Sequence, residues 1–311
     1  QLRRLGHSTL EIFPWSFGTN VLGRAIDEPT AFAVLDAYVE VGGNCIDTAD
    51  VYSTGESEAV LGRWMKARGN RNRVIIATKL GHSMGPGKQG LSRNYIFEAV
   101  EASLLRLQTD YIDLYQAHRD DPEMSLEETL RAFDELVRQG KIRVIGASNY
   151  SATRLAEALQ ASQQHGYARY ESLQPLYNLV DRQAYEQELE PFSRKHGLGV
   201  ITYSSLASGF LTGKYQQGKA LPKSHRAPRV QSRYMHERGF RILAEVERVA
   251  SRHHATPAQV ALAWIISRPG ITAPIASATS VEQVRELRGA VELKLDDEAL
   301  VSLDKASAWQ K

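Results

Sequence analysis

The sequence has 311 residues, and its 38 Lys and Arg against 36 Asp and Glu give a formal net charge of +2. Hydrophobic residues make up 42% and charged residues 24%, which is typical of a globular protein with a large core and excludes a wholly disordered chain. A charge this close to neutral argues against a dedicated nucleic-acid binder, because such a protein presents a strongly basic face.

Cys45 is the one cysteine, so the sequence excludes an intramolecular disulfide and a cysteine-based zinc site, and we predict no bound metal. No stretch approaches the run of about 18 apolar residues that a transmembrane helix needs. The first six residues lack the apolar core of a signal peptide. We therefore expect a cytoplasmic protein with no membrane partner.

Short apolar or β-branched runs alternate with amphipathic segments along the chain. The runs predict eight strands, over residues 12–19, 44–48, 73–78, 112–118, 142–147, 170–175, 199–203 and 271–276. The segments between them predict helices near 29–41, 57–66, 92–107, 126–139, 151–162, 182–196, 234–267 and 281–289. Such alternation is typical of parallel strands joined by right-handed crossovers.

Eight such units in one domain over residues 1–311 favour a closed (β/α)8 TIM barrel. The rival fold is an open doubly wound sheet, but the G-x-G-x-x-G pattern typical of its dinucleotide site does not follow the first strand. Residues 3–6 and 9–12 are predicted to pair as a short hairpin that caps the bottom of the barrel. Residues 216–233 and 81–90 form the two least regular stretches, and both are predicted to be long loops on the active face.

Polar residues at the carboxyl ends of barrel strands face the active-site mouth. Four ionisable residues hold such positions: Asp47, Tyr52 in the loop after it, Lys79 and His118. A lysine buried at a strand end needs an anion, which Asp47 on the adjacent strand can supply. An ammonium group near Tyr52 favours the phenolate, so we expect the pKa of Tyr52 to lie below its usual value of about 10.

Together these side chains would form a site that protonates a carbonyl oxygen, with Tyr52 as the general acid and His118 fixing the direction of that oxygen. Each residue also has a simpler interpretation. A single aspartate or histidine at a strand end is more often a structural hydrogen-bonding group, and Asp47 with Lys79 could be a structural ion pair. Lys79 could also form a Schiff base, as in barrel aldolases. The four in combination favour the carbonyl site.

Several sequence blocks with consistent spacing carry a family resemblance: residues 43–52, 55–58, 61–62, 78–79, 113–118, 145–150 and 174–178. From about Arg4 to Ser302 the chain resembles the aldo-keto reductase family. The resemblance implies a barrel enzyme that reduces aldehydes or ketones with a nicotinamide cofactor held in extended form. It implies a small-molecule carbonyl substrate and leaves assembly into a homo-oligomer open.

The resemblance also implies roles for individual residues. Tyr52 would donate the proton, Lys79 and Asp47 would tune it, and His118 would orient the carbonyl. Ser148, Asn149 and Gln174 would hold the nicotinamide carboxamide, with Tyr203 stacked under the ring. The other implied cofactor contacts are Gly18, Thr19, Asn20 and Asp47; the pyrophosphate-loop residues Ser204, Ser205, Leu206, Ala207, Gly209, Leu211 and Lys214; Arg226 in the long loop; and Ser277, Thr279, Gln283 and Glu286 at the adenosine end.

The residues implied to hold the adenosine end of the cofactor depart from common family patterns. Ser277 replaces a frequent glycine or lysine, and Thr279 and Ser280 stand where a basic residue would be expected. NADPH is the expected cofactor, and NADH is kept as an alternative. The family also includes potassium-channel β subunits, so the alternative function is a nucleotide-binding regulatory subunit with slow turnover. The presence of all four catalytic residue types favours the enzyme, and the sequence leaves its substrate open.

Overall fold

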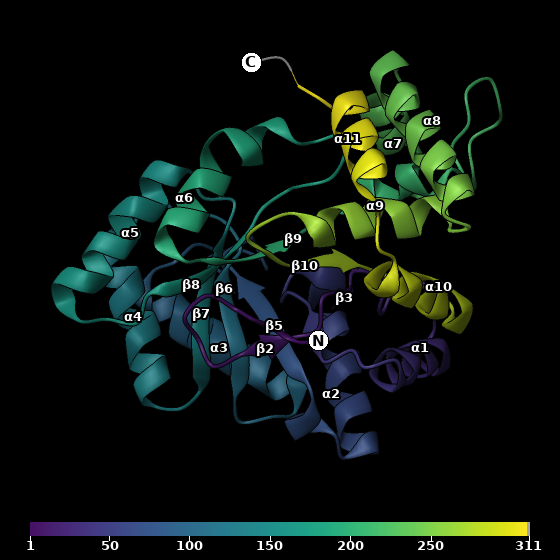
Figure 1. The fold of residues 1–311 in the computed structure, drawn as a ribbon. Helices are drawn as coiled ribbons and strands as arrows, with labels where there is room; N and C mark the ends of the chain where they lie inside the picture. The colour runs from purple at the N-terminus through teal and green to yellow at the C-terminus, as the bar shows by residue number, and fades with distance from the viewer. Residues whose placement is uncertain (310–311) are drawn as a thin grey trace.

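A computed structural model describes residues 1–309 of the chain, in which eight parallel strands close into a barrel (Figure 1). The strands are β3 (Ser16–Gly18), β4 (Cys45–Asp47), β5 (Ile75–Leu80), β6 (Ile112–Ala117), β7 (Ile142–Ser148), β8 (Tyr170–Gln174), β9 (Gly199–Thr202) and β10 (Ile271–Ala276). They follow one another around the ring, and β10 pairs with both β9 and β3. The prediction of a (β/α)8 barrel is confirmed.

Helices surround the barrel. They are α1 (Glu28–Glu40), α2 (Glu56–Arg68), α3 (Arg93–Leu107), α4 (Leu126–Arg138), α5 (Ala152–His165), α6 (Glu190–His196), α7 (Ala227–Tyr234), α8 (Glu237–Arg252), α9 (Pro257–Ser267), α10 (Val281–Glu292) and α11 (Asp297–Ala306). Many begin at a side chain that accepts a backbone N–H of the first turn, such as Ser125 at α4. Thr256 and Gln259 form a reciprocal capping box at α9, whose first residue is Pro257.

The structure corrects several predicted boundaries. The first predicted strand, 12–19, is divided, because Ile12 belongs to the antiparallel pair and only Ser16–Gly18 joins the barrel. Pro14 lies between the two pieces and has no N–H to donate to a continuous ladder. The single helix predicted over 234–267 is two helices, since the capping box starts α9 afresh at Pro257.

Two helices were not predicted. Within the long loop, α7 buries Ala227, Val230 and Tyr234 on one face, although most of its other residues are polar. After the last predicted helix, α11 starts at the capping side chain of Asp296 and buries Ala299 and Leu303 one turn apart. Both are short, and their amphipathic pattern covers only two or three buried positions. Their apolar contact is therefore set by the neighbouring elements rather than by a strong local signal.

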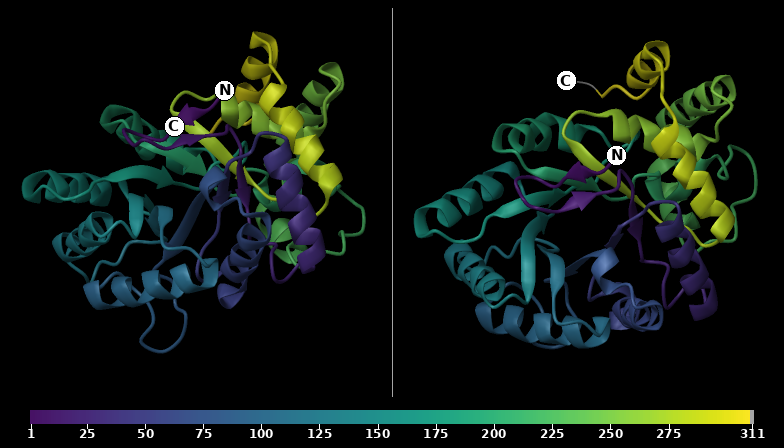
Figure 2. Two further views of the ribbon diagram at one scale, coloured as in Figure 1. Left: turned by 90° about the horizontal axis from the view of Figure 1, so that it is seen from below. Right: turned by 60° about the horizontal axis from the view of Figure 1, so that its bottom comes forward.

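The hairpin of β1 (Arg3–Arg4) and β2 (Glu11–Ile12) lies across the amino-terminal end of the barrel, as predicted (Figure 2). Its apolar residues Leu5, Leu10 and Ile12 are buried. They form one cluster with inward side chains of six barrel strands: Cys45, Ala77, Leu114, Val144, Ile201 and Ala273. The hairpin therefore closes the bottom of the barrel with an apolar layer.

Side chains two residues apart on a strand point to the same side, so the next inward layer follows directly from that apolar one. Cys45 is followed by Asp47, Ala77 by Lys79 and Leu114 by Gln116. Asp47, Lys79 and Gln116 are buried, and they form a polar layer toward the carboxyl ends of β4, β5 and β6. The register pairs Lys79 with Gln116 and Asp47 with Ala77, so Lys79 lies one inward position beyond the partner of Asp47 on the neighbouring strand.

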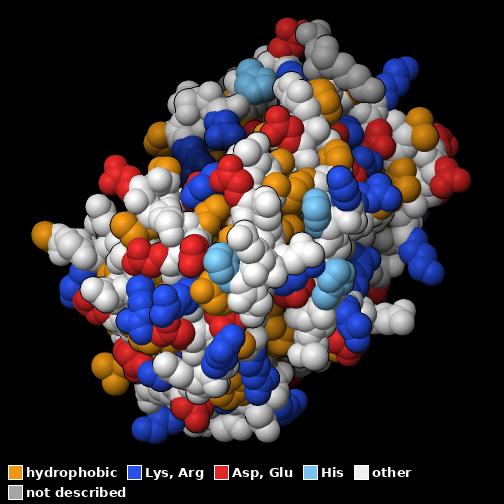
Figure 3. Space-filling view, turned by 90° about the vertical axis from the view of Figure 1, so that its left-hand side faces the viewer, with side chains coloured by type: hydrophobic (Ala, Val, Ile, Leu, Met, Phe, Trp, Pro, Cys, Tyr) orange, Lys and Arg blue, Asp and Glu red, His pale blue; other side chains and the backbone are white. Residues whose placement is uncertain are grey.

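Basic and acidic side chains are interspersed over the side of the molecule shown in Figure 3. Within residues 1–309, many charged side chains form ion pairs, such as Arg93 with Glu135 at 2.6 Å and Arg138 with Asp134 at 2.7 Å. Among the described residues, none of the helices has the length and apolar character needed to cross a membrane.

Candidate active site

Three of the four predicted catalytic side chains meet around one buried ammonium group. The Lys79 Nζ donates to Asp47 Oδ1 at 2.6 Å, to the Thr48 carbonyl at 2.8 Å and to the Tyr52 hydroxyl at 3.3 Å. Lys79 is fully buried and Asp47 is 2% exposed, whereas Tyr52 is half-buried. The lysine thus joins a buried carboxylate to a phenol that reaches the mouth.

The Asp47 carboxylate is held from its other side by two amides. Gln174 Nε2 donates to Asp47 Oδ2 at 2.9 Å, and Gln116 Nε2 lies 3.4 Å from the same oxygen. Gln174 Nε2 also donates to Gln116 Oε1 at 3.1 Å. Both carboxylate oxygens therefore have partners, which offsets the cost of burying this charge.

Burial alone would lower the pKa of Lys79, but the Asp47 carboxylate and Tyr52 outweigh it and raise that pKa above its ordinary value. Lys79 therefore stays an ammonium group at neutral pH. A protonated amine is not a nucleophile, so this environment argues against the Schiff-base interpretation of Lys79.

The expected direction for Tyr52 was wrong. Burial raises the pKa of Tyr52, Lys79 lowers it and Asp47 raises it, and the net result lies above the ordinary value. The expectation counted only the ammonium and left out the desolvation of the phenolate, which is the larger effect here. Tyr52 is consequently a neutral phenol at neutral pH, with its proton available for donation.

His118, directly after β6, lies edge-on to Tyr52 with ring centroids 6.1 Å apart. Burial, with the positive charges of Lys79 and Arg119 and the neighbouring His82, lowers the pKa of His118 to about 2. The imidazole is therefore neutral, and its Nδ1 is buried without a hydrogen-bond partner among the described residues. A neutral imidazole can donate a hydrogen bond from one nitrogen but is not itself the proton source.

The residues expected around the nicotinamide lie together at the ends of β7, β8 and β9. Asn149 adopts a left-handed backbone conformation with φ 56°, and its amide donates to the His118 carbonyl at 2.9 Å. Its Oδ1 accepts from the Tyr203 hydroxyl at 2.9 Å, and Ser148 Oγ donates to the Gln174 carbonyl at 2.8 Å. Gln174 also holds Asp47, so one side chain links this group to the buried ion pair.

The segment expected to hold the pyrophosphate contains a 3₁₀ turn over Ala207–Thr212. Positive φ values at Ser204, Ala207, Ser208 and Gly209 curl its backbone tightly. Successive turns of this kind gather N–H groups into a concave site for anions. The side chains of Ser205, Ala207 and Leu211 are buried, so this segment would offer mainly its backbone. Lys214 folds back over Gly209, since a Cβ there would lie 3.1 Å from its Nζ.

Basic side chains from two loops gather next to this segment. Arg226 precedes α7, and its pKa is lowered by burial and by Arg24. The pKa of Lys214 is likewise lowered by burial and by Arg226. Arg24, Lys214 and Arg226 form no ion pair with a carboxylate within residues 1–309. Mutually repelling cations without acidic partners fit a phosphate-bearing ligand.

At the end of the site expected to hold the adenosine, Ser277 Oγ donates to Asn20 Oδ1 at 2.9 Å, and a Cβ on Gly18 would lie 2.8 Å from that Oγ. Thr279 bonds to Gln283 through both its N–H and its hydroxyl. Ser280 caps α10, while Glu286 lies farther along that helix and accepts from Gln259 through its carbonyl. Thr19 is fully buried, donates to the Asp47 carbonyl and accepts from Ser57, so its side chain supports β4.

Sequence reasoning missed several members of this site. Gln116 lies two residues before His118 on the same strand, and the period of a strand could have placed it with the inward layer. His82 packs edge-on against His118 with ring centroids 4.2 Å apart, a contact that depends on the path of the loop after β5. Arg24 Nη2 lies 3.0 Å from His225 Nε2 across 201 residues, which no local pattern reveals.

A buried acidic pair behind the site was also missed. Glu58 is fully buried and accepts from Thr78 at 2.9 Å and from Arg106 at 2.8 Å. Asp50 is 1% exposed, and its Oδ1 has no hydrogen-bond partner among the described residues. Burial and the neighbouring Glu58 raise the pKa of Asp50 to about 7. The charged form of Asp50, two residues from Tyr52, is therefore disfavoured in the folded protein.

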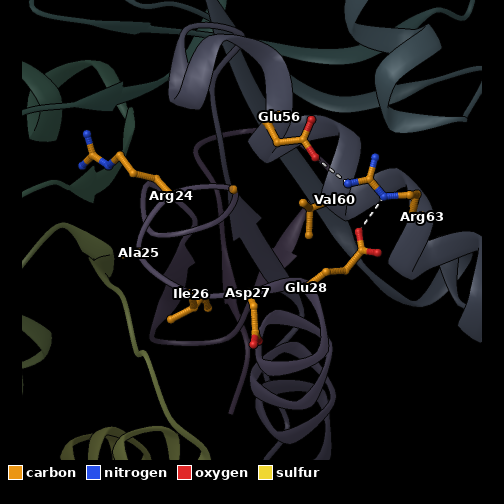
Figure 4. Close-up of a pocket in the computed structure, with 9 residues that line it drawn as sticks. Arg24, Ala25, Ile26, Asp27, Glu28, Glu56, Val60 and Arg63 are labelled. Carbon is orange, nitrogen blue, oxygen red and sulfur yellow. Dashed lines mark hydrogen bonds and ion pairs between the residues drawn. The ribbon is translucent and has the colours of Figure 1, made fainter.

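A surface hollow lies beside the site between the loop after β3 and helix α2 (Figure 4). Arg63 bridges Glu28 and Glu56 at 2.5 Å each on one side of it. Arg24 lines the hollow but extends away from these ion pairs. The hollow is thus separate from the mouth that contains Tyr52 and His118.

Comparison with known proteins agrees with this arrangement. The model of the aldo/keto reductase family matches residues 14–308. The chain belongs to the aldo/keto reductase family. Similar members include a probable voltage-gated potassium channel subunit beta of Arabidopsis thaliana, with 34% identity over 94% of this chain and 92% of the relative. Protein tas of Escherichia coli shows 34% identity over 98% of this chain and 96% of its own length. The oxidoreductase YrpG of Bacillus subtilis shows 35% identity over 96% and 94%.

Membership of the aldo/keto reductase family supports an oxidoreductase that acts on a small molecule with a nicotinamide cofactor. The chain covers more than nine tenths of the length of each of these relatives.

Proposed function

We propose that this aldo/keto reductase is an NADPH-dependent carbonyl reductase in which Tyr52 is the general acid. The observation that carries the proposal is the contact of one buried ammonium, Lys79, with both Asp47 and the Tyr52 hydroxyl. Reduction of a carbonyl needs a proton at oxygen and a hydride at carbon. A bound nicotinamide supplies the hydride, and the described side chains supply the rest.

Tyr52 would hold the proton until the carbonyl oxygen becomes an alkoxide, since its raised pKa keeps the phenol neutral beforehand. As Tyr52 becomes a phenolate, the nearby Lys79 ammonium would stabilise the new negative charge. Neutral His118 would donate a hydrogen bond to the same carbonyl oxygen and fix its direction. Asp47 would keep Lys79 charged and in place.

The cofactor would be held along the ends of β7 to β10. Ser148, Asn149 and Gln174 would bind the carboxamide, Tyr203 would face the ring, and the backbone of residues 204–213 would bind the pyrophosphate. Arg24, Lys214 and Arg226 support a preference for the additional phosphate of NADPH, because within residues 1–309 they form no ion pair with a carboxylate. The neutral Thr279 and Ser280 weaken that preference, so NADH use is expected to be measurable.

Tyr52→Phe tests the proposal by removing one hydroxyl. We expect kcat for a reactive aromatic aldehyde, followed by loss of NADPH absorbance, to fall by roughly 10²–10⁴-fold. Affinity for NADPH, measured by fluorescence quenching, should stay close to wild type. Tyr115→Phe is the matched control, because Tyr115 lies on the same barrel and its buried hydroxyl has no hydrogen-bond partner among the residues that the structure describes. Wild-type turnover by Tyr52→Phe would refute the role of Tyr52.

A nucleotide-binding regulatory subunit is the second candidate, because similar proteins bear the name of a channel subunit beta. Such a protein would bind NADPH tightly and turn over slowly. Tight NADPH binding by the wild type without measurable steady-state reduction of several aldehydes would favour this role over that of a reductase.

A further inference from the structure

A left-handed turn of the backbone follows Tyr52 directly. Ser53 has φ 49° and ψ 36°, Thr54 has φ 53° and ψ 45°, and Gly55 continues the turn with φ 93°. The left-handed region is disfavoured for residues that carry a Cβ, and most of all for β-branched residues such as Thr54. Backbone strain of this kind persists only where surrounding contacts hold it, and it clusters at functional sites.

Contacts within the turn give it little support. The Tyr52 N–H donates to the Ala49 carbonyl at 3.2 Å. The Thr54 N–H donates to the Val51 carbonyl, also at 3.2 Å, and Thr54 is exposed. Both hydrogen bonds lie at the long end of the normal range. The turn therefore depends on an anchor outside itself.

The Ser53 hydroxyl supplies such an anchor. It donates to the carbonyl of the fully buried Leu22 at 2.9 Å, in the loop between β3 and α1. The next residue of that loop, Gly23, packs against the same turn, since a Cβ there would lie 2.6 Å from Glu56 Cγ and 3.5 Å from Ser53 Cβ. Among the described residues, no other hydrogen bond joins 52–55 to 20–26.

The loop that receives this bond is itself held in place. The Leu22 N–H donates to the carbonyl of the buried Thr19 at 2.9 Å. Asn20 Oδ1 accepts from Ser277 Oγ at 2.9 Å, which ties the loop to the segment after β10. A loop fixed at these points is a firm support for the turn that bears the phenol.

The contacts at the far end of the turn are a less suitable anchor for Tyr52. A Cβ on Gly55 would lie 2.8 Å from Arg106 Cδ, and Arg106 pairs with the buried Glu58 at 2.8 Å. These contacts fix the start of α2. The strained residues lie between them and the phenol, so they do not determine where the phenol points.

We propose that Ser53 is a positioning residue for Tyr52. Its bond to the Leu22 carbonyl holds the strained turn so that the Tyr52 hydroxyl lies 3.3 Å from Lys79 Nζ. The proposal rests on the carbonyl reductase function and adds a residue that acts through the proton donor. A phenol displaced by about 1 Å would transfer its proton more slowly, whereas substrate and cofactor would bind as before.

Single-turnover oxidation of NADPH by a reactive aromatic aldehyde, followed by stopped flow, tests the role of the hydroxyl. We expect the rate to fall about tenfold in both Ser53→Ala and Ser53→Gly. KM for the aldehyde and Kd for NADPH should stay within about twofold of wild type. Ser53→Thr keeps a hydroxyl and should recover most of the rate. Ser162→Ala is the matched control, because Ser162 also donates to a backbone carbonyl at 2.9 Å, that of Ala168 just before β8 at the bottom of the barrel.

The glycine variant separates the hydrogen bond from backbone strain, because glycine adopts φ 49° readily. A wild-type rate in Ser53→Gly, or a fall in Ser162→Ala equal to that in Ser53→Ala, would overturn the proposal. Adding Ser53→Ala to Tyr52→Phe should change the residual rate by less than about twofold, since Ser53 acts through the phenol. A further tenfold fall in that double variant would assign Ser53 a role apart from Tyr52 and overturn the proposal as well.

Hydrogen exchange separates this proposal from the reductase function, because it needs no turnover. In Ser53→Ala, the amide hydrogens of Tyr52 and Thr54 should exchange about tenfold faster than in the wild type. That of Asp50, which donates to the Lys79 carbonyl at 3.1 Å, should keep its rate. Faster exchange alongside a wild type that reduces no aldehyde would support the anchoring by Ser53 and refute the reductase function. Unchanged exchange at Tyr52 and Thr54 would overturn the anchoring even if the wild type is an active reductase.

Discussion

Asp50 makes the stability of this protein depend on pH near neutrality, and Asp50→Asn should remove that dependence. The side chain is 1% exposed, its Oδ1 has no hydrogen-bond partner within residues 1–309, and Glu58 lies near it. Its pKa is raised from 3.8 to about 7 in the folded protein. The folded state therefore holds the Asp50 proton more tightly than the unfolded chain does.

The pKa of Asp50 is higher in the folded protein than in the unfolded chain, and this determines the direction in which stability changes with pH. The wild type loses stability as pH rises from about 4, where the unfolded chain ionises, to about 7, where the folded protein ionises. A difference between 3.8 and about 7 corresponds to about 4 kcal/mol in total, of which about 3 kcal/mol falls between pH 5 and pH 8. An amide at this position does not titrate in that range.

Urea unfolding at pH 5 and pH 8, followed by tryptophan fluorescence, measures the effect. We subtract the unfolding free energy of Asp50→Asn from that of the wild type. This difference should be lower at pH 8 than at pH 5. Asp110→Asn is the control, because Asp110 is exposed and should leave the pH dependence of the wild type unchanged. Identical pH dependence in the wild type and Asp50→Asn would refute this account of the buried carboxylate.

Three further predictions follow from contacts in the site and the core. Lys79→Met leaves the Asp47 carboxylate buried without a cation, so urea unfolding should show a loss of roughly 3–5 kcal/mol in the unfolding free energy. Adding Asp47→Asn should recover part of that loss without restoring carbonyl reduction. Equal stability of the single and double variants would contradict this reasoning. Arg226→Gln should raise the Kd of NADPH about tenfold in a fluorescence titration, whereas Arg241→Gln, at an exposed position of α8, should not. Equal effects of the two substitutions would remove Arg226 from the proposed phosphate site. Gly62→Ala would bring a Cβ to 2.3 Å from the backbone oxygen of Arg106 and should lower the unfolding free energy by at least about 2 kcal/mol. Gly289→Ala would bring a Cβ to 2.3 Å from Gln259 Nε2, a side-chain atom that can move at the cost of its hydrogen bond to the Glu286 carbonyl, and it should therefore cost less in the same assay.

The sequence was sufficient to predict the barrel, because each strand is an apolar run and each active-face residue interrupts that run at its end. Asp47, Lys79 and His118 could be placed in this way, and the structure brings Asp47, Lys79 and Tyr52 into contact. Short elements were missed where the local pattern was weak. The helices α7 and α11 are determined by what packs against them.

The direction of the Tyr52 pKa could not be predicted, because it depends on how much water the surrounding loops exclude. Sequence reasoning counted charges near Tyr52 but had no measure of its burial. The contact of His82 with His118 and that of Arg24 with His225 depend equally on loop paths. The sequence thus predicts properties that depend on a residue's position along a strand, but not those that depend on the path of a loop.

The amino-terminal hairpin limits the routes by which protons could reach the buried ion pair in the proposed reaction. Leu5, Leu10 and Ile12 seal the layer directly beneath Asp47 and Lys79, so bulk water meets this pair from the mouth side. If Tyr52 is the general acid, as we propose, the proton that replaces the one it gives up would arrive by the same opening as the substrate. Reprotonation would wait until the alcohol leaves, and a short segment remote from the reacting atoms would thereby order the steps of the cycle.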